Sequence, residues 1–83
     1  MTYVDKVLQA LYYYEESFPN RFFSAEDIAD HANIDVYAAK DTLRKLFKKQ
    51  LIARQKIRQT FAYKILPAGI RFMRREKKII EVS

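Results

Sequence analysis

The sequence predicts a fold that is mainly α with a small β-hairpin (α+β), in the order helix, short strand, helix, helix, strand, strand, helix. Three observations predict it. Apolar residues recur at helical spacing in several stretches, two short alternating runs surround Arg58, Gln59 and Thr60, and turn or capping residues separate these segments. With 83 residues the chain has room for a single domain, here 1–83.

The first helix is predicted over residues 2–16. Its apolar side chains follow the i, i+3, i+4, i+7 spacing of an amphipathic helix, at Val4, Val7, Leu8 and Leu11. Pro19 then breaks the helix, and Phe22 and Phe23 are expected to return to the core as a minimal strand. Tyr13 projects from the polar side, where it is either one exposed aromatic ring or a contact with a second subunit.

Capping residues divide the next stretch into two helices. Ser24 occupies the N-cap of a helix over residues 25–32, and Asn33 fits the left-handed position that closes it. Asp35 then caps a third helix over residues 36–50. Because so short a polar turn forces the two helices to cross, residues 24–50 are predicted to form a helix-turn-helix.

The third helix has an apolar face and a charged face. At 100° per residue, the core face holds Val36, Ala39, Leu43, Leu46 and Phe47. The outward face holds the candidate nucleic-acid contacts Tyr37, Lys40, Asp41, Arg44, Lys45 and Lys48. Such side chains suit base edges and phosphates in a major groove. The spacing of Asp41 from Arg44 and Lys45 is equally that of an ordinary solvated helix, so this helix alone leaves both interpretations open.

A β-hairpin is predicted over residues 51–65, with a three-residue loop at Arg58, Gln59 and Thr60. In this register a mostly apolar face pairs Ile57 with Phe61, Gln55 with Tyr63 and Ala53 with Ile65. The other face pairs Lys56 with Ala62 and Arg54 with Lys64, and it is basic. Arg54, Lys56, Arg58, Gln59 and Lys64 therefore complete the candidate DNA-binding set. The competing interpretation is a solvated strand edge that lysines protect from aggregation.

The last helix is predicted over residues 67–80, beginning at Pro67, whose fixed φ suits a helix start. Its apolar arc is wider than one core requires. A homodimer through the first and last helices would use that surplus, with contacts from Tyr13, Phe72, Ile79 and Ile80. The alternatives are a frayed tail with two exposed isoleucines and a helix lying on a membrane surface.

Charge is divided unevenly along the chain. Residues 1–35 hold two basic and seven acidic residues, a net charge of −5, whereas residues 36–83 hold fourteen basic and three acidic ones, a net charge of +11. A positive face of this kind is typical of nucleic-acid binders, although a basic surface without a partner has the same pattern.

Several kinds of chemistry have little support. Without cysteine or a second histidine no metal site is expected, and His31 is placed against the end carbonyls of its helix. One glycine cannot build a phosphate-cradling loop, so neither an enzyme nor a cofactor is expected. We also expect no membrane partner, because no apolar run approaches about 20 residues, and we expect a cytoplasmic protein, nucleoid-associated when bound to DNA.

Two motifs carry a family resemblance. Leu43-x-x-Leu46 followed by Leu51-Ile52, and Tyr63-x-Ile65-x-x-x-Gly69-Ile70, resemble patterns of the winged helix-turn-helix domain of small bacterial and archaeal transcriptional regulators. Gln50 departs from the pattern, since the family often has glycine there. The resemblance implies a hairpin "wing" over residues 51–65 and a recognition helix before it.

Two functions follow from the sequence. The first is a regulator of transcription that binds double-stranded DNA, with the third helix in the major groove and the wing on the backbone or minor groove. The second is a winged-helix adaptor that binds RNA or protein within a larger assembly, such as a ribosome, because the fold alone does not set the ligand.

Overall fold

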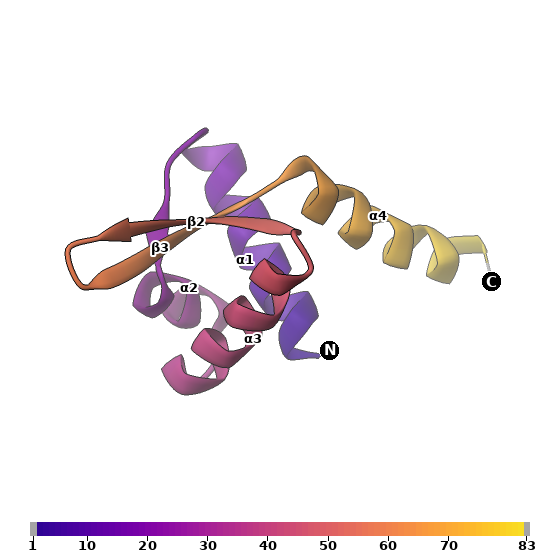
Figure 1. Ribbon diagram of the computed structural model, residues 1–83. Helices are drawn as coiled ribbons and strands as arrows, with labels where there is room; N and C mark the ends of the chain where they lie inside the picture. Colours follow the sequence, from indigo (N-terminus) through magenta and orange to yellow (C-terminus); the bar gives the residue numbers. More distant parts are fainter. Residues whose placement is uncertain (1, 83) are drawn as a thin grey trace.

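The computed structural model describes the backbone of residues 2–82 and the side chains of residues 2–75 (Figure 1). The described chain forms four α-helices and a three-stranded antiparallel sheet, in the predicted order. The bounds are α1 Tyr3–Ser17, β1 Phe23–Ser24, α2 Ala25–Ala32, α3 Val36–Lys48, β2 Ile52–Ile57, β3 Thr60–Ile65 and α4 Pro67–Val82.

The helix starts follow the capping residues in the sequence. The Ser24 hydroxyl accepts a hydrogen bond from the Asp27 amide at 3.1 Å, and the Asp35 carboxylate accepts from the amides of Tyr37 and Ala38. These contacts confirm both predicted N-caps, because each satisfies amides that the first turn of a helix leaves unpaired. Asn33, with φ of 57°, closes α2 in the predicted left-handed conformation.

The end of α3 differs from the prediction, since the helix stops at Lys48 and not at Gln50. Gln50 has a φ of 62°. Its amide donates to the Phe47 carbonyl at 3.0 Å, and the Leu51 amide donates to the Leu46 carbonyl at 3.1 Å. This is a complete Schellman motif, so glutamine meets the hydrogen-bonding requirement in a conformation that glycine adopts at less cost.

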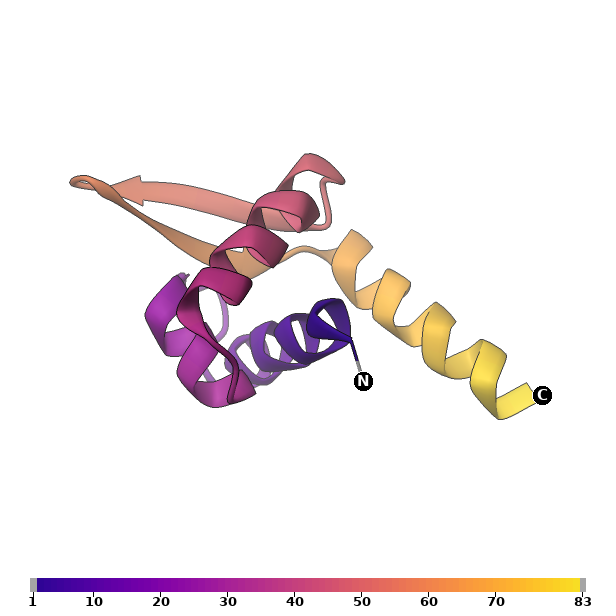
Figure 2. The same ribbon diagram turned by 90° about the horizontal axis from the view of Figure 1, so that it is seen from below.

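A single core lies between α1, α2, α3 and the sheet. Its most deeply buried side chains come from every one of these layers and are Val7, Leu8, Leu11, Ile28, Leu43, Leu46, Ile52 and Ile65. Figure 2 shows α1 (indigo) beside α2, with α3 passing above it, while the far end of the β2–β3 hairpin extends past the helices. The hairpin tip is therefore the part of the sheet most exposed to solvent.

The strand order is β1-β3-β2, and the predicted hairpin register is wrong by one residue. The observed pairs are Ile52 with Ile65, Ala53 with Lys64, Arg54 with Tyr63, Gln55 with Ala62, Lys56 with Phe61 and Ile57 with Thr60. The loop is thus two residues long, and Thr60 belongs to β3. Arg58, with φ of 59°, takes the first loop position, which a two-residue turn with this φ normally gives to glycine.

The register fails because β3 is a central strand. The prediction assumed one apolar and one polar face, but β3 pairs with β1 on its other edge, and both Ala62 and Tyr63 are buried. Consecutive buried residues occur where a strand is covered on both faces, and α1 contacts β3 on one of them. The alternation of apolar and polar residues therefore does not identify the register here.

The helix α4 starts against the core and then leads away from it (Figure 1). Met73 is buried and Phe72 packs partly on the core. The predicted contacts Ile79 and Ile80 lie outside the described side chains. None of the described helices combines the length and the apolar character needed to cross a membrane.

Candidate nucleic-acid interface

The outward face of α3 presents the predicted side chains to solvent. Tyr37 is 75% exposed, and Lys40, Arg44, Lys45 and Lys48 are also exposed. They share one face because the opposite side of the helix, with Ala39, Leu43 and Leu46, is buried in the core. The burial of that side fixes which residues a ligand on α3 meets.

Asp41 joins two of these cations. Its carboxylate oxygens lie 2.6 Å from Arg44 Nη2 and 3.1 Å from Lys45 Nζ. Hydrogen bonds from Lys45 and Arg44 hold the pKa of Asp41 below its usual range, so the carboxylate is charged at neutral pH. Both predicted pairings of an ordinary solvated helix are thus present, and a polyanion must compete with Asp41 for these two side chains.

The hairpin adds a second set of cations on the side that faces α3. Arg54 and Lys56 lie on one face of β2, together with Tyr63 and Phe61 of β3, because these residues are direct cross-strand pairs. Arg58 and Gln59 form the exposed loop at the tip. The structure therefore brings together the outward face of α3, Arg54, Lys56, Arg58 and Gln59.

Arg54 is held by two aromatic rings. Its guanidinium carbon lies 4.0 Å from the centroid of the Phe47 ring on α3 and 4.2 Å from that of Phe61 on β3. Cations over ring faces are attracted by the ring quadrupole, by about 0.5–1 kcal/mol at exposed sites. The stacked Arg54 links the end of α3 to the middle of the hairpin.

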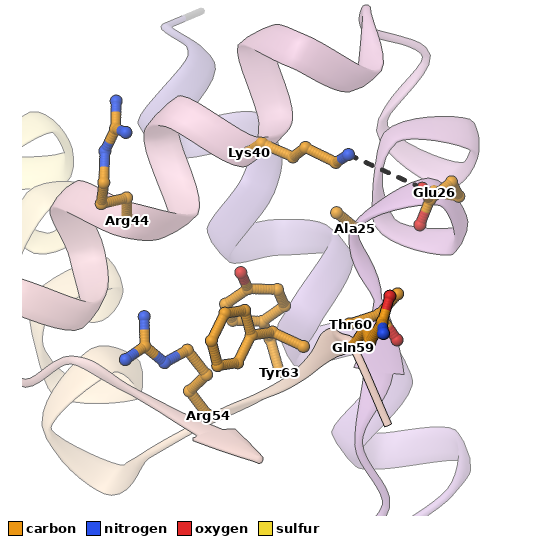
Figure 3. A pocket seen from close by; sticks show the side chains of 9 residues that line it. Ala25, Glu26, Lys40, Arg44, Arg54, Gln59, Thr60 and Tyr63 are labelled. Carbon is orange, nitrogen blue, oxygen red and sulfur yellow. Dashed lines mark ion pairs between the residues drawn. The ribbon is translucent and has the colours of Figure 1, made fainter. Parts of the chain in front are cut away.

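A groove of about 300 Å³ separates α3 from the hairpin (Figure 3). Lys40 and Arg44 line it from α3, and Arg54, Phe61 and Tyr63 line it from the hairpin. The remaining lining comes from the start of α2 and the hairpin tip, at Ala25, Glu26, Gln59 and Thr60. Lys40 Nζ lies 3.9 Å from a carboxylate oxygen of Glu26, both well exposed, so this ion pair is weak.

Lys64 does not belong to this surface, which corrects the prediction. The one-residue change of register turns it to the opposite face, where its ammonium lies 3.4 Å from Glu15 of α1. Both side chains are about one-fifth exposed. The other Glu15 oxygen accepts a hydrogen bond from the Asn20 amide at 3.2 Å. Lys64 thus ties β3 to α1.

Sequence reasoning missed the two aromatic side chains that line the groove. Phe61 and Tyr63 were expected on a mostly apolar hairpin face, whereas the expected packing of Phe47 against the core is confirmed. The observed register places Arg54 directly opposite Tyr63, and a correct count of the loop residues would have shown it. The pKa of the Tyr63 phenol is raised above its usual value because the residue is buried, and the positive charge of nearby Arg54 offsets part of that rise.

His31 and Tyr13 form a separate contact between α2 and α1. Their rings stack at 4.4 Å with an interplanar angle of 14°, and Tyr13 remains 49% exposed. Among the described residues, no group of three or more histidine or carboxylate side chains is close enough to hold a metal ion.

Two crossed helices, an exposed hairpin after the second of them and a closing helix define a winged helix-turn-helix domain, in which α3 is the second helix of the pair and β2–β3 the wing. No protein-family model and no curated protein sequence matches the chain. Solved structures of similar fold establish the architecture.

Three of these structures illustrate the similarity. BpsR of Bordetella bronchiseptica, studied for the regulation of its DNA binding by 6-hydroxynicotinic acid, is 18% identical over 98% of this chain, with a TM-score of 0.78. MepR of Staphylococcus aureus in complex with DNA is 20% identical over 98%, with a TM-score of 0.73. A MarR-family transcription regulator is 13% identical over 99%, with a TM-score of 0.74. The chain spans 55%, 64% and 54% of these proteins respectively.

Proposed function

We propose that this domain binds double-stranded DNA and regulates transcription, with α3 in the major groove and the wing on the backbone or the adjacent minor groove. The observation that carries the proposal is the joint surface of α3 and the wing. Lys48 on α3 and Lys56 and Arg58 on the wing are exposed, and none of them has an ion-pair partner among the described side chains. Unpaired cations on one face are the electrostatic requirement for phosphate contacts.

The structural neighbours support the proposal. The proteins of similar fold include MepR in complex with DNA and BpsR, whose DNA binding is the subject of that study. Within the site, Arg44 and Tyr37 are the candidates for base contacts, since both are exposed on the outward face of α3. Arg54, Lys56 and Arg58 are the candidates for phosphates.

Three single-charge variants test the proposal. Lys48→Gln removes a charge from α3, Lys56→Gln removes one from the wing, and Lys64→Gln is the matched control on the opposite face. Binding of a labelled duplex is measured by fluorescence anisotropy across a salt titration. In each of the first two variants, the negative slope of log K against log salt becomes less steep by about one unit, because one fewer phosphate is neutralised. The control keeps the wild-type slope.

The titration also separates the alternatives. Equal slopes for all three variants would mean that the α3–wing face is not the binding surface. Tighter binding of a structured RNA than of duplex DNA, by about tenfold, would favour the adaptor function instead. Selection from random duplexes then identifies the site, and Arg44→Ala is expected to lose about 1–3 kcal/mol on the selected sequence if Arg44 reads a base.

We also propose that two copies associate through α1 and α4, since a twofold dimer would match an inverted-repeat DNA site. Tyr13 and Phe72 are the described candidates for this contact, together with Ile79 and Ile80. Sedimentation of the wild type and of Tyr13→Ser at several concentrations tests this dimer. A wild-type protein that stays monomeric at all concentrations contradicts the proposed association.

A further inference from the structure

The groove between α3 and the wing contains a guanidinium that is fixed before any ligand arrives. The Phe47 and Phe61 rings, 4.0 and 4.2 Å from the Arg54 guanidinium carbon, come from different elements. A guanidinium stacked on rings keeps its in-plane N–H groups available, and these match the oxygens of a phosphate in bidentate geometry. Arg54 lines the groove and has no carboxylate partner among the described side chains.

Two further donors line the same groove. Figure 3 shows the Tyr63 hydroxyl pointing from the wing toward the α3 ribbon, and this side chain is 93% buried, at 7% exposure. The hydroxyl makes no hydrogen bond to any residue that the structure describes. The hydroxyl oxygen keeps contact with solvent although the ring is buried, so an anion in the groove would reach it and accept its hydrogen bond. Lys40 supplies an ammonium from the α3 side.

The charges opposing an anion here are few. Glu26 lines the groove, but it lies 3.9 Å from Lys40 with its side chain 68% exposed, so the pair is easily rearranged. Asp41 is engaged with Arg44 and Lys45. In Figure 3, Arg44 points away from Tyr63 and the wing. Arg54 is thus the groove-lining cation that stacks on rings of both α3 and the wing.

We propose that this groove binds one phosphodiester of the DNA backbone, which accepts hydrogen bonds from the guanidinium of Arg54 and the hydroxyl of Tyr63 beside the ammonium of Lys40. The inference rests on the proposed function and deepens it. When a helix occupies the major groove and a wing reaches the neighbouring minor groove, a sugar-phosphate strand must pass between them. The α3–wing groove is the space that this strand would cross.

Matched arginine-to-lysine substitutions test whether the stacked geometry matters or only the charge. Arg54→Lys keeps the charge but loses the planar fork and its stacking, so duplex binding weakens by about three- to tenfold. Arg21→Lys makes the same change at an exposed arginine that lies outside the α3–wing surface, and binding stays within about twofold of wild type. Neither variant changes the salt slope, because neither changes the charge. Circular dichroism confirms that both are folded.

Two variants probe the other parts of the site. Phe61→Leu keeps the arginine at position 54 but removes one of the two rings that stack on it, so duplex binding weakens by about two- to fivefold. Tyr63→Phe removes only the hydroxyl, and it weakens binding by about threefold or more, because a donor to a charged group is lost. Wild-type affinity for Tyr63→Phe would exclude that hydroxyl from the site.

A spectroscopic readout on the wild type does not depend on any variant folding. The Nε–Hε resonance of Arg54 is expected to shift on addition of duplex DNA more than that of Arg21, since the Arg54 donors lie in the phosphate site. Inorganic phosphate alone, at the same molar ratio, is expected to leave it unchanged. Saturation by inorganic phosphate would instead assign the groove to a free anion and overturn the backbone assignment.

The outcomes separate this inference from the function on which it rests. If the wild type binds duplex DNA while Arg54→Lys binds as tightly as Arg21→Lys, the phosphate site is wrong and DNA binding stands. If the wild type does not bind duplex DNA at all, both the proposed function and the phosphate site fail.

Discussion

Replacing Gly69 by alanine tests how closely α4 packs against the base of the wing. A Cβ at this position would collide with the Leu51 carbonyl oxygen and lie 2.8 Å from Ile65 Cγ1, closer than atoms pack without displacement. The carbonyl cannot easily withdraw, because it accepts a hydrogen bond from the Leu66 amide at 3.1 Å. Glycine is therefore required here by space, since its φ is an ordinary helical one.

The expected effect is a net loss of stability despite a favourable helix propensity. Alanine gains about 1 kcal/mol over glycine within a helix. Overpacking costs about 1–3 kcal/mol, and a weakened Leu66–Leu51 hydrogen bond costs about 1 kcal/mol more. Gly69→Ala should thus lower the unfolding free energy by roughly 1–3 kcal/mol, which is a large share of the stability of roughly 5–10 kcal/mol expected at this size.

Urea unfolding followed by far-UV circular dichroism measures this difference, and thermal unfolding should show a fall of about 4–8 °C for each kcal/mol. The sign of the change is decisive. If Gly69→Ala is as stable as the wild type or more stable, helix propensity outweighs the contact with Leu51, and the close approach described above is wrong.

Three further changes have expected outcomes. Gln50→Gly should raise the unfolding free energy by about 1 kcal/mol in urea titrations, because glycine adopts the φ of 62° without strain. Asn33→Gly should raise the unfolding free energy by less, because asparagine tolerates a positive φ better than glutamine does. Glu15→Gln should cost about 1 kcal/mol and leave DNA affinity unchanged, and a double-mutant cycle with Lys64→Gln should show coupling of the two side chains. Burial raises the pKa of the Tyr63 phenol in the folded protein. The contribution of the neutral phenol to the unfolding free energy is therefore complete below about pH 10 and is lost as pH rises through the folded pKa. Denaturant titrations across the alkaline range would detect this loss.

The helical part of the fold could be predicted because its signals are local. Ser24 and Asp35 cap helices wherever their side chains reach the next amides, and Asn33 ends a helix because it tolerates a positive φ. The outward face of α3 followed from its apolar spacing alone. These features depend on residues within about one turn of one another, so a single sequence contains them.

The wing could not be predicted in the same way, because its register depends on contacts that are distant in the sequence. Its tip extends into solvent, and its two loop residues, Arg58 and Gln59, are not those that usually mark a tight turn. Meanwhile α1 and β1 cover β3 from other directions and bury Ala62 beside Tyr63. The error moved Lys64 onto the surface shared by α3 and the wing and concealed the stacking of Arg54.

The Leu51 peptide has a mechanical consequence. Its amide donates to α3 at Leu46, its carbonyl accepts from Leu66 at the start of α4, and the next residue, Ile52, begins β2. The helix α3, the wing and α4 are thus joined at one peptide unit without a flexible linker between them. A force applied to α4 would therefore be passed to α3 and the wing together, so a partner that holds α4 would set the orientation of both elements.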